Sequence, residues 1–170
     1  MLSVLIETRD NEEALARTLA SLIPAVVEGA IREVVVCDLG STDQTRYVAE
    51  HAGCNFIAAG GIATGIARAK GDWLILLEPG ARLLDGWTEP VVLHAGKSMM
   101  PARFARARSE RLPFLARVFS ANRALAEGLI MSKLQASSLA KNASSAEALA
   151  RGLATKQLSA EIVPAAPKKA

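Results

Sequence analysis

The stretch Gly71-Asp-Trp-Leu-Ile-Leu-Leu-Glu-Pro-Gly80 decides which class of fold this chain can adopt. Its apolar residues, Trp73 to Leu77, form a continuous run that is typical of a strand buried on both faces. The charged Glu78 and the turn-forming pair Pro79-Gly80 then end the run abruptly. In open α/β sheets, ligands bind just beyond the carboxyl end of such a strand. The stretch therefore predicts a central strand of an α/β protein, with Glu78 at a candidate ligand site.

Strands and helices alternate on the amino-terminal side of this run, which implies a mostly parallel sheet covered on both faces. The expected strands there are 3–8, 33–37 and 55–58, and the expected helices begin near Asp10, Thr42 and Gly61. Asp10 with Glu13 has the spacing of a capping box. Further along, the pattern predicts helices within 86–96, 113–127 and 137–155, an extended segment at 97–106, and strands at 128–131 and 158–163.

Length and composition predict one soluble domain, 1–163, followed by a solvated, disordered tail, 164–170. The net charge of +3 is too small to imply a nucleic-acid partner, and no reader motif accompanies it. Charged residues soon after Met1 argue against a signal peptide, so we expect a cytoplasmic protein. Cys37 and Cys54 lack metal or disulfide spacing and are expected to be buried thiols. His51 and His94 have no partner at metal spacing and are expected to be surface or packing residues.

Several short polar motifs lie where strands end. Asp38 follows a buried strand, where a carboxylate can accept hydrogen bonds from a base or ribose, whereas Asp43 falls in the first helical turn and suits a capping role. The glycine-rich segment 60–65 opens a helix, and we favour a close-packed helix start over phosphate binding.

An arginine-rich and phenylalanine-containing stretch, 103–127, has three interpretations: a solvated face, an interfacial membrane helix or a phosphate-binding surface. The membrane hypothesis, which would place the protein at the inner face of the membrane, depends on an amphipathic face made by Phe114, Leu115, Val118 and Phe119. Binding of the domain to a partner protein, instead of to a membrane surface, is a further open alternative.

Four sequence blocks between Leu2 and Trp87, about half of the chain, resemble glycosyltransferase family 2. The blocks are S-V-L-I-x-T-x-x-x-E-E-x-L-x-R-T-L-A-S-L, V-V-V-x-D-x-G-S-T-D-x-T, G-I-A-R-A-K-G-D-W-L-I-L-L and A-R-L-L-D-G-W. In addition, the segment Glu127–Lys133 is similar to the acceptor-side strand of that family, where D-Q-G-L is common.

This resemblance implies a GT-A fold, a Rossmann-like three-layer α/β sandwich with a mostly parallel central sheet. Residues 1–87 would form the nucleotide-binding half and residues 88–163 the acceptor-side half. The implied activity is sugar transfer from a nucleotide-sugar donor to a cell-envelope or polysaccharide acceptor with Mg²⁺ or Mn²⁺. By position in the motifs, the nucleotide-binding residues would be Thr8, Asp38, Gly40 and Ser41, and the metal ligand would be Glu78.

Departures from the family's pattern fall at the positions that carry its chemistry. Asp-x-Asp, which holds the metal, is replaced by Glu78-Pro79-Gly80, and Leu39 replaces the second acid of the Asp-Asp-Gly-Ser turn. The family's Pro-Thr-Tyr-Asn-Glu is Glu-Thr-Arg-Asp-Asn from Glu7, and the catalytic Glu-Asp pair is missing, with Glu147 the nearest acid. Two hypotheses follow. In the first, the domain is an active transferase in which Glu78 alone recruits the metal, or in which arginines such as Arg82 and those after Arg103 neutralise the diphosphate. In the second, the domain is an inactive module that binds a nucleotide or a partner protein.

Overall fold

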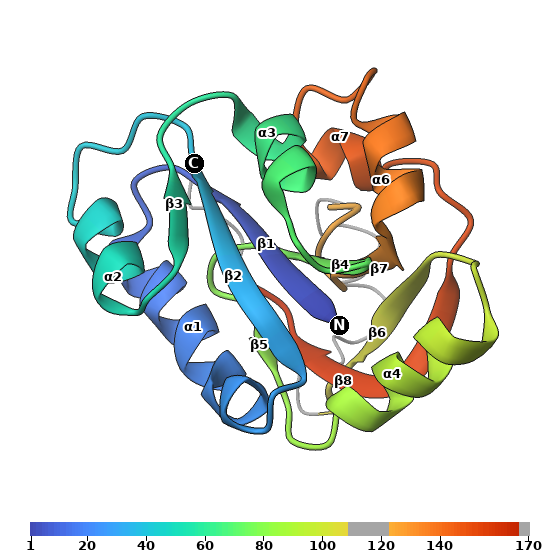
Figure 1. Ribbon diagram of the computed structural model, residues 1–170. Coiled ribbons are helices and arrows are strands. Elements are labelled where there is room, and N and C mark those ends of the chain that lie inside the picture. The colour runs from blue at the N-terminus through green and yellow to red at the C-terminus, as the bar shows by residue number, and fades with distance from the viewer. Residues whose placement is uncertain (109–122, 167–170) are drawn as a thin grey trace, which may run out of the picture.

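The computed structural model describes residues 1–108 and 123–166 of the chain, which form a curved sheet with helices on both faces (Figure 1). The strands are β1 Leu2–Thr8, β2 Ile31–Asp38, β3 Asn55–Ile57, β4 Trp73–Leu77, β5 Arg82–Leu83, β6 Ala102–Arg106, β7 Leu129–Ser132 and β8 Lys156–Val163. The helices are α1 Glu12–Val27, α2 Thr45–His51, α3 Gly61–Arg68, α4 Thr88–Lys97, α6 Lys133–Leu139 and α7 Ala146–Ala150.

The strands lie in the order β3-β2-β1-β4-β7-β6-β8-β5. The first four are parallel, as the alternation of strands and helices predicts, and β4 occupies the central position expected of the run Trp73–Leu77. The second half is mixed, because β7 is antiparallel to both β4 and β6, whereas β8 is parallel to β6 and antiparallel to β5. The α/β class and the mostly parallel sheet are therefore confirmed.

Two hydrophobic clusters, one on each face of the sheet, make the fold a three-layer sandwich. Helices α1, α2 and α4 contribute to the cluster on one face, and α3, α6 and α7 contribute to the cluster on the other face. Neighbouring strand residues alternate between the clusters: Val4 and Ile6 of β1 belong to the first, and Leu5 belongs to the second. All five residues of β4 are buried, so this strand is covered by helices on both sides.

The last described residues, which were expected to begin a solvated tail, still pack on the domain. The side chain of Ala165 is buried, and its carbonyl accepts a hydrogen bond of 2.6 Å from Arg123 Nη2. A Cβ atom built on Gly80, in the turn after β4, would lie 3.3 Å from the Ala165 Cβ. Ala165 therefore lies against the turn that follows the central strand.

Several other sequence expectations have clear outcomes. The two thiols are free, with Cys37 buried and Cys54 partly buried, and burial raises the pKa of Cys37 to about 12 and that of Cys54 to about 11. His94 packs edge-on against Trp73, and its Nε2 lies 2.7 Å from the Met100 carbonyl, so the packing interpretation is confirmed. The apolar residues of the proposed membrane face, 114–119, lie outside the described residues. Among the described helices, none has the length and apolar character needed to span a bilayer.

Close packing of α3 on the sheet gives a first testable prediction. Gly65 lies directly over β1 and β2, and an added Cβ atom would overlap with Cys37 Sγ and lie 3.4 Å from Leu5 Cδ2. We expect Gly65→Ala to lower the free energy of unfolding by about 2 kcal/mol, because α3 must shift outward or Cys37 must change rotamer. Urea unfolding monitored by tryptophan fluorescence measures the difference.

The matched control is Gly96→Ala in α4, where no atom lies within 4 Å of the new Cβ. Alanine has the higher helix propensity, so this variant should be as stable as the parent or more stable by up to about 1 kcal/mol. Equal effects of the two substitutions would show that the α3–sheet contact is not tight.

Candidate functional site

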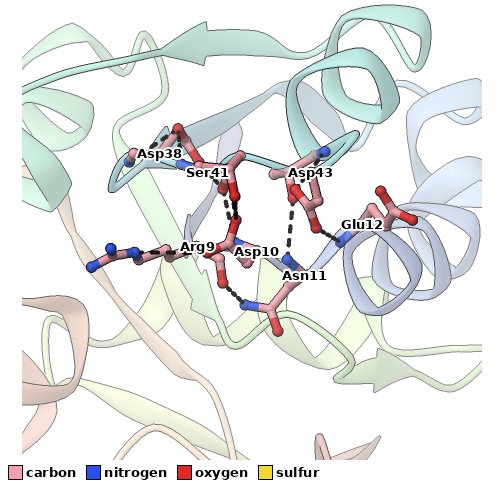
Figure 2. A network of polar contacts seen from close by, with 10 residues as sticks. Arg9, Asp10, Asn11, Glu12, Asp38, Ser41 and Asp43 are labelled. Atoms are coloured by element: carbon pink, nitrogen blue, oxygen red, sulfur yellow. Dashed lines mark hydrogen bonds and ion pairs between the residues drawn. The ribbon is translucent and has the colours of Figure 1, made fainter.

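The carboxyl ends of β1 and β2 carry two loops, 9–11 and 39–44, that are tied together by polar contacts (Figure 2). Asp38, at the end of β2, is buried, and both of its carboxylate oxygens are used within its own turn. Its Oδ2 accepts hydrogen bonds from the backbone N–H groups of Gly40 (3.1 Å) and Ser41 (2.9 Å), and its Oδ1 accepts one from Ser41 Oγ. Asp38 therefore fixes the shape of the turn.

The predicted capping box at Asp10 is wrong, because this side chain bonds to the other loop instead of to helix α1. Asp10 Oδ1 accepts the backbone N–H of Thr42 at 2.7 Å, and Asp10 N donates to Ser41 Oγ at 2.8 Å. Asp10 has a φ of +49°, a left-handed conformation, and it precedes Asn11, the N-cap residue of α1. The helix instead begins at Glu12, whose N–H donates to Asp43 Oδ2 at 3.2 Å.

The helical end of the second loop depends on Asp43. The sequence places Asp43 in the first turn of the next helix, but α2 begins only at Thr45 with Gln44 at its N-cap, so Asp43 lies just before the helix. Its Oδ1 accepts the backbone N–H of Thr45 at 2.9 Å, and its Oδ2 accepts that of Glu12, the first residue of α1. Hydrogen bonds to Thr45 lower the pKa of the Asp43 carboxyl, and the backbone N–H of Thr42 lowers that of Asp10. The charged forms of both side chains thus hold the loops in place.

These lowered pKa values predict a contribution to stability that depends on pH. A carboxyl whose pKa is lower in the folded state stabilises the fold fully above its ordinary pKa, about pH 4, and loses that effect as the pH falls through the lowered value. We expect Asp43→Asn to unfold at lower urea concentration than the parent at about pH 7, and the difference to shrink as the pH falls below about 4. Asp85→Asn, at an exposed aspartate in the loop after β5, is the control. A gap between Asp43→Asn and the parent that is constant with pH would contradict the prediction.

Thr8, the last residue of β1, is also buried at this edge. Its carbonyl accepts the N–H of Leu39, but its hydroxyl oxygen has no hydrogen-bond partner among the described residues. The structure therefore brings together at the ends of β1 and β2 the four residues for which the family resemblance predicts nucleotide binding: Thr8, Asp38, Gly40 and Ser41.

The turn after β4 holds an ion pair. Glu78 Oε2 lies 3.0 Å from Arg123 Nη1, and the two side chains are only 17% and 28% exposed, respectively. The oxygen is buried and accepts no hydrogen bond from any residue that the structure describes, so its contact with Arg123 is a charge pair without good donor geometry. Burial raises the pKa of the Glu78 carboxyl, and the charge of Glu147 adds to the rise, whereas Arg123 and Arg106 oppose it. The desolvation of this carboxylate is thus only partly compensated.

Two further arginines converge on a second glutamate close by. Arg103 Nη1 and Arg106 Nε each lie 3.0 Å from a carboxylate oxygen of Glu127. Arg106 comes from β6 and Glu127 from the segment before β7, so these pairs join β6 to the residues that lead into β7. Arg82 is exposed on β5 and forms no ion pair with any described residue.

Glu147, the nearest acid to the expected catalytic base, has a structural partner. Its two oxygens accept the backbone N–H groups of Ala124 (2.7 Å) and Leu125 (2.9 Å). It therefore fixes the segment that carries Arg123 and Glu127. Glu7, where the family has proline, has a comparable role: it accepts the N–H of Ile62 at 3.2 Å and that of Ala146 at 3.0 Å, at the beginnings of α3 and α7.

The described residues do not fit a divalent cation at this turn. Glu78 is the sole carboxylate of the Glu78-Pro79-Gly80 turn, it is paired with a guanidinium, and Gly80 offers no side-chain ligand. Among residues 1–108 and 123–166, no three histidine, cysteine or acidic side chains group closely enough to hold a metal. Mg²⁺ and Mn²⁺ need oxygen ligands that carry negative charge, so the guanidinium would oppose their binding.

The sequence matches the family description "Glycosyl transferase family 2" over residues 3–106. The chain belongs to glycosyl transferase family 2. A TPR repeat-containing protein from Synechococcus elongatus is 37% identical over 97 residues, which are 51% of this chain and 22% of that relative. The chain thus spans less than a quarter of the length of this curated relative.

Solved structures support the GT-A fold of this family 2 domain. Glucosyl-3-phosphoglycerate synthase from Mycobacterium tuberculosis, in complex with Mn²⁺, UDP and glucosyl-3-phosphoglycerate, superposes with a TM-score of 0.70 at 17% identity, covering 100% of this chain and 73% of that one. The same enzyme has also been solved with Mg²⁺ and UDP. TarS from S. aureus superposes with a TM-score of 0.64 at 16% identity, covering 93% and 57%.

Sequence reasoning did not predict the contacts of two residues that the structure places at these strand ends, Arg123 and Glu7. The pairing of Arg123 with Glu78 joins positions 45 residues apart, and no local pattern signals such a contact. Glu7 could have been noticed, because a charged residue in a strand that is otherwise buried needs a partner.

Proposed function

We propose that this family 2 domain binds a nucleoside diphosphate or nucleotide sugar and has lost metal-dependent sugar transfer, so that it works as a nucleotide-binding or partner-binding module. One observation carries the proposal: a guanidinium lies beside Glu78, at the end of β4, where the family would hold a metal ion. The engagement of Glu147 by two backbone N–H groups supports it further, because a base must be free to reach the acceptor.

The loops at the ends of β1 and β2 support the nucleotide-binding part of the proposal. Their conformation is held by the hydrogen bonds of Asp10, Asp38 and Asp43, and ligands of open α/β folds bind at this edge of the sheet. Glucosyl-3-phosphoglycerate synthase has been solved with UDP, which makes UDP the first nucleotide to try. The cytoplasmic location and the class of acceptor stay predictions.

Calorimetric titration of the purified protein with UDP and GDP, each in buffer with EDTA and in buffer with Mn²⁺, tests the proposal. We expect one nucleotide to bind with the same affinity in both buffers. Absence of binding in both would overturn the nucleotide-binding proposal and favour a purely protein-binding module. Binding that requires Mn²⁺ would show that a metal site exists after all.

Sugar transfer is the second candidate, and the raised pKa of Glu78 next to Glu147 favours it. Carboxyls with shifted pKa values at a strand end are a common feature of acid–base sites. An active enzyme would release UDP from a UDP-sugar, and Glu78→Gln would abolish that release while leaving the folded protein intact. Steady UDP release by the pure parent protein would therefore refute the loss of transfer.

A further inference from the structure

The cation at the end of β4 is a side chain of the protein itself. The guanidinium of Arg123 is held from two sides, by Glu78 Oε2 at 3.0 Å from Nη1 and by the Ala165 carbonyl at 2.6 Å from Nη2. Segment 123–127 is anchored in turn by Glu147, which accepts the N–H groups of Ala124 and Leu125. Arg123 is thus fixed in place before any ligand binds.

The internal partner of this guanidinium is a poor one. Within residues 1–108 and 123–166, Glu78 Oε2 is buried and accepts no hydrogen bond, so the carboxylate is desolvated without full compensation. A phosphate group offers several charged oxygens that can each take an N–H group, and the planar fork of arginine suits this geometry. An incoming phosphate can therefore replace Glu78 as the partner of Arg123 at small cost.

We propose that Arg123 binds the diphosphate of the nucleotide in place of a divalent metal, with Glu78 acting as a counter-ion that the diphosphate displaces. This inference rests on the proposed nucleotide-binding function. It assigns Glu78 a role opposite to that of a metal ligand. A metal-ligating Glu78 would promote diphosphate binding, whereas a competing Glu78 weakens it.

The two roles predict changes of opposite sign, which calorimetry can measure in EDTA-containing buffer. We expect Arg123→Gln to bind UDP about tenfold more weakly than the parent, because a charge-assisted hydrogen bond is lost. Glu78→Gln should bind UDP several-fold more tightly. Uridine, which lacks phosphates, should bind all variants alike. Arg17→Gln, at an exposed arginine of α1, serves as the control.

Two outcomes would overturn the inference: equal UDP affinity of Arg123→Gln and the parent, or weaker binding by Glu78→Gln in the presence of Mn²⁺. Because Arg123→Gln leaves Glu78 unpaired, it could fail to fold, and the double variant Glu78→Gln with Arg123→Gln then replaces it. This double variant removes both charges together and should show the same loss of UDP affinity relative to Glu78→Gln.

Titration with inorganic pyrophosphate separates this inference from the proposed function. If neither UDP nor uridine binds the parent, the proposed nucleotide-binding function fails. The role of Arg123 would still be supported if pyrophosphate binds the parent and binds Arg123→Gln about tenfold more weakly. Failure of pyrophosphate to bind the parent would remove that role from Arg123.

Discussion

Replacing Glu147 with glutamine is expected to lower the free energy of unfolding by about 3 kcal/mol. Both oxygens of Glu147 accept backbone N–H groups, from Ala124 at 2.7 Å and from Leu125 at 2.9 Å. Glutamine keeps one acceptor oxygen but turns an NH₂ group toward the second N–H, so one hydrogen bond is lost and two donors face each other. Because this segment carries Arg123, UDP affinity should fall together with stability.

Urea unfolding and UDP titration of the same preparation test this role of Glu147. The matched control is Glu13→Gln in α1, whose exposed carboxylate lies 3.8 Å from Arg17 and should contribute less than about 0.5 kcal/mol. A catalytic base would behave differently, since Glu147→Gln would then keep its stability and its UDP affinity and lose only transfer. That result would indicate that Glu147 acts as the catalytic base in place of the missing Glu-Asp pair.

The second large effect is expected at Glu7. Its carboxylate accepts the N–H of Ile62 at 3.2 Å and the N–H of Ala146 at 3.0 Å, and so joins α3 to α7 across the end of β1. Replacement by glutamine removes the charge and one acceptor, and we expect a loss of about 2–3 kcal/mol in the free energy of unfolding.

Glu50→Gln is the control for Glu7, because Glu50 makes an exposed ion pair with Arg46 on α2. Its substitution should change stability by less than about 0.5 kcal/mol. A Glu7→Gln variant as stable as Glu50→Gln would mean that water replaces the carboxylate easily, and that the two helices are held by the hydrophobic cluster beneath them.

The strands of the amino-terminal half could be predicted closely from the sequence, because each is a short apolar run that ends at a turn residue. The run Trp73–Leu77 is an example: burial on both faces leaves a continuous apolar signal, and β4 has those bounds. Strand β5, with only Arg82 and Leu83, was not predicted. Its sole strand partner in the described part of the chain is β8, about 80 residues later, and such a distant pairing leaves no local pattern.

The sequence predicted the edge of the sheet at which the candidate site lies, but not the hydrogen-bond partners of its side chains. Asp38 follows an apolar strand and lies at the expected edge, since parallel strands bring their carboxyl ends together. The partners of its carboxylate could not be predicted, because Ser41 reaches it only in the turn conformation that the folded loop adopts. Asp10 shows the same limit, because its spacing to Glu13 suits a helix cap, but contacts with loop 39–44 override it.

The position of β8 in the sheet has a consequence for how the chain is made. β8 lies between β6 and β5, and β5 has no other strand partner among the described residues. During synthesis on the ribosome, the parallel half, β1 to β4, can assemble early, because all its strands precede residue 78. Strand β7 can then pair with β4 and β6, but β5 and one edge of β6 gain their partner only after residues 156–163 have left the exit tunnel. Until then, the unpaired edge of β6 is a site where chaperones or neighbouring nascent chains can bind.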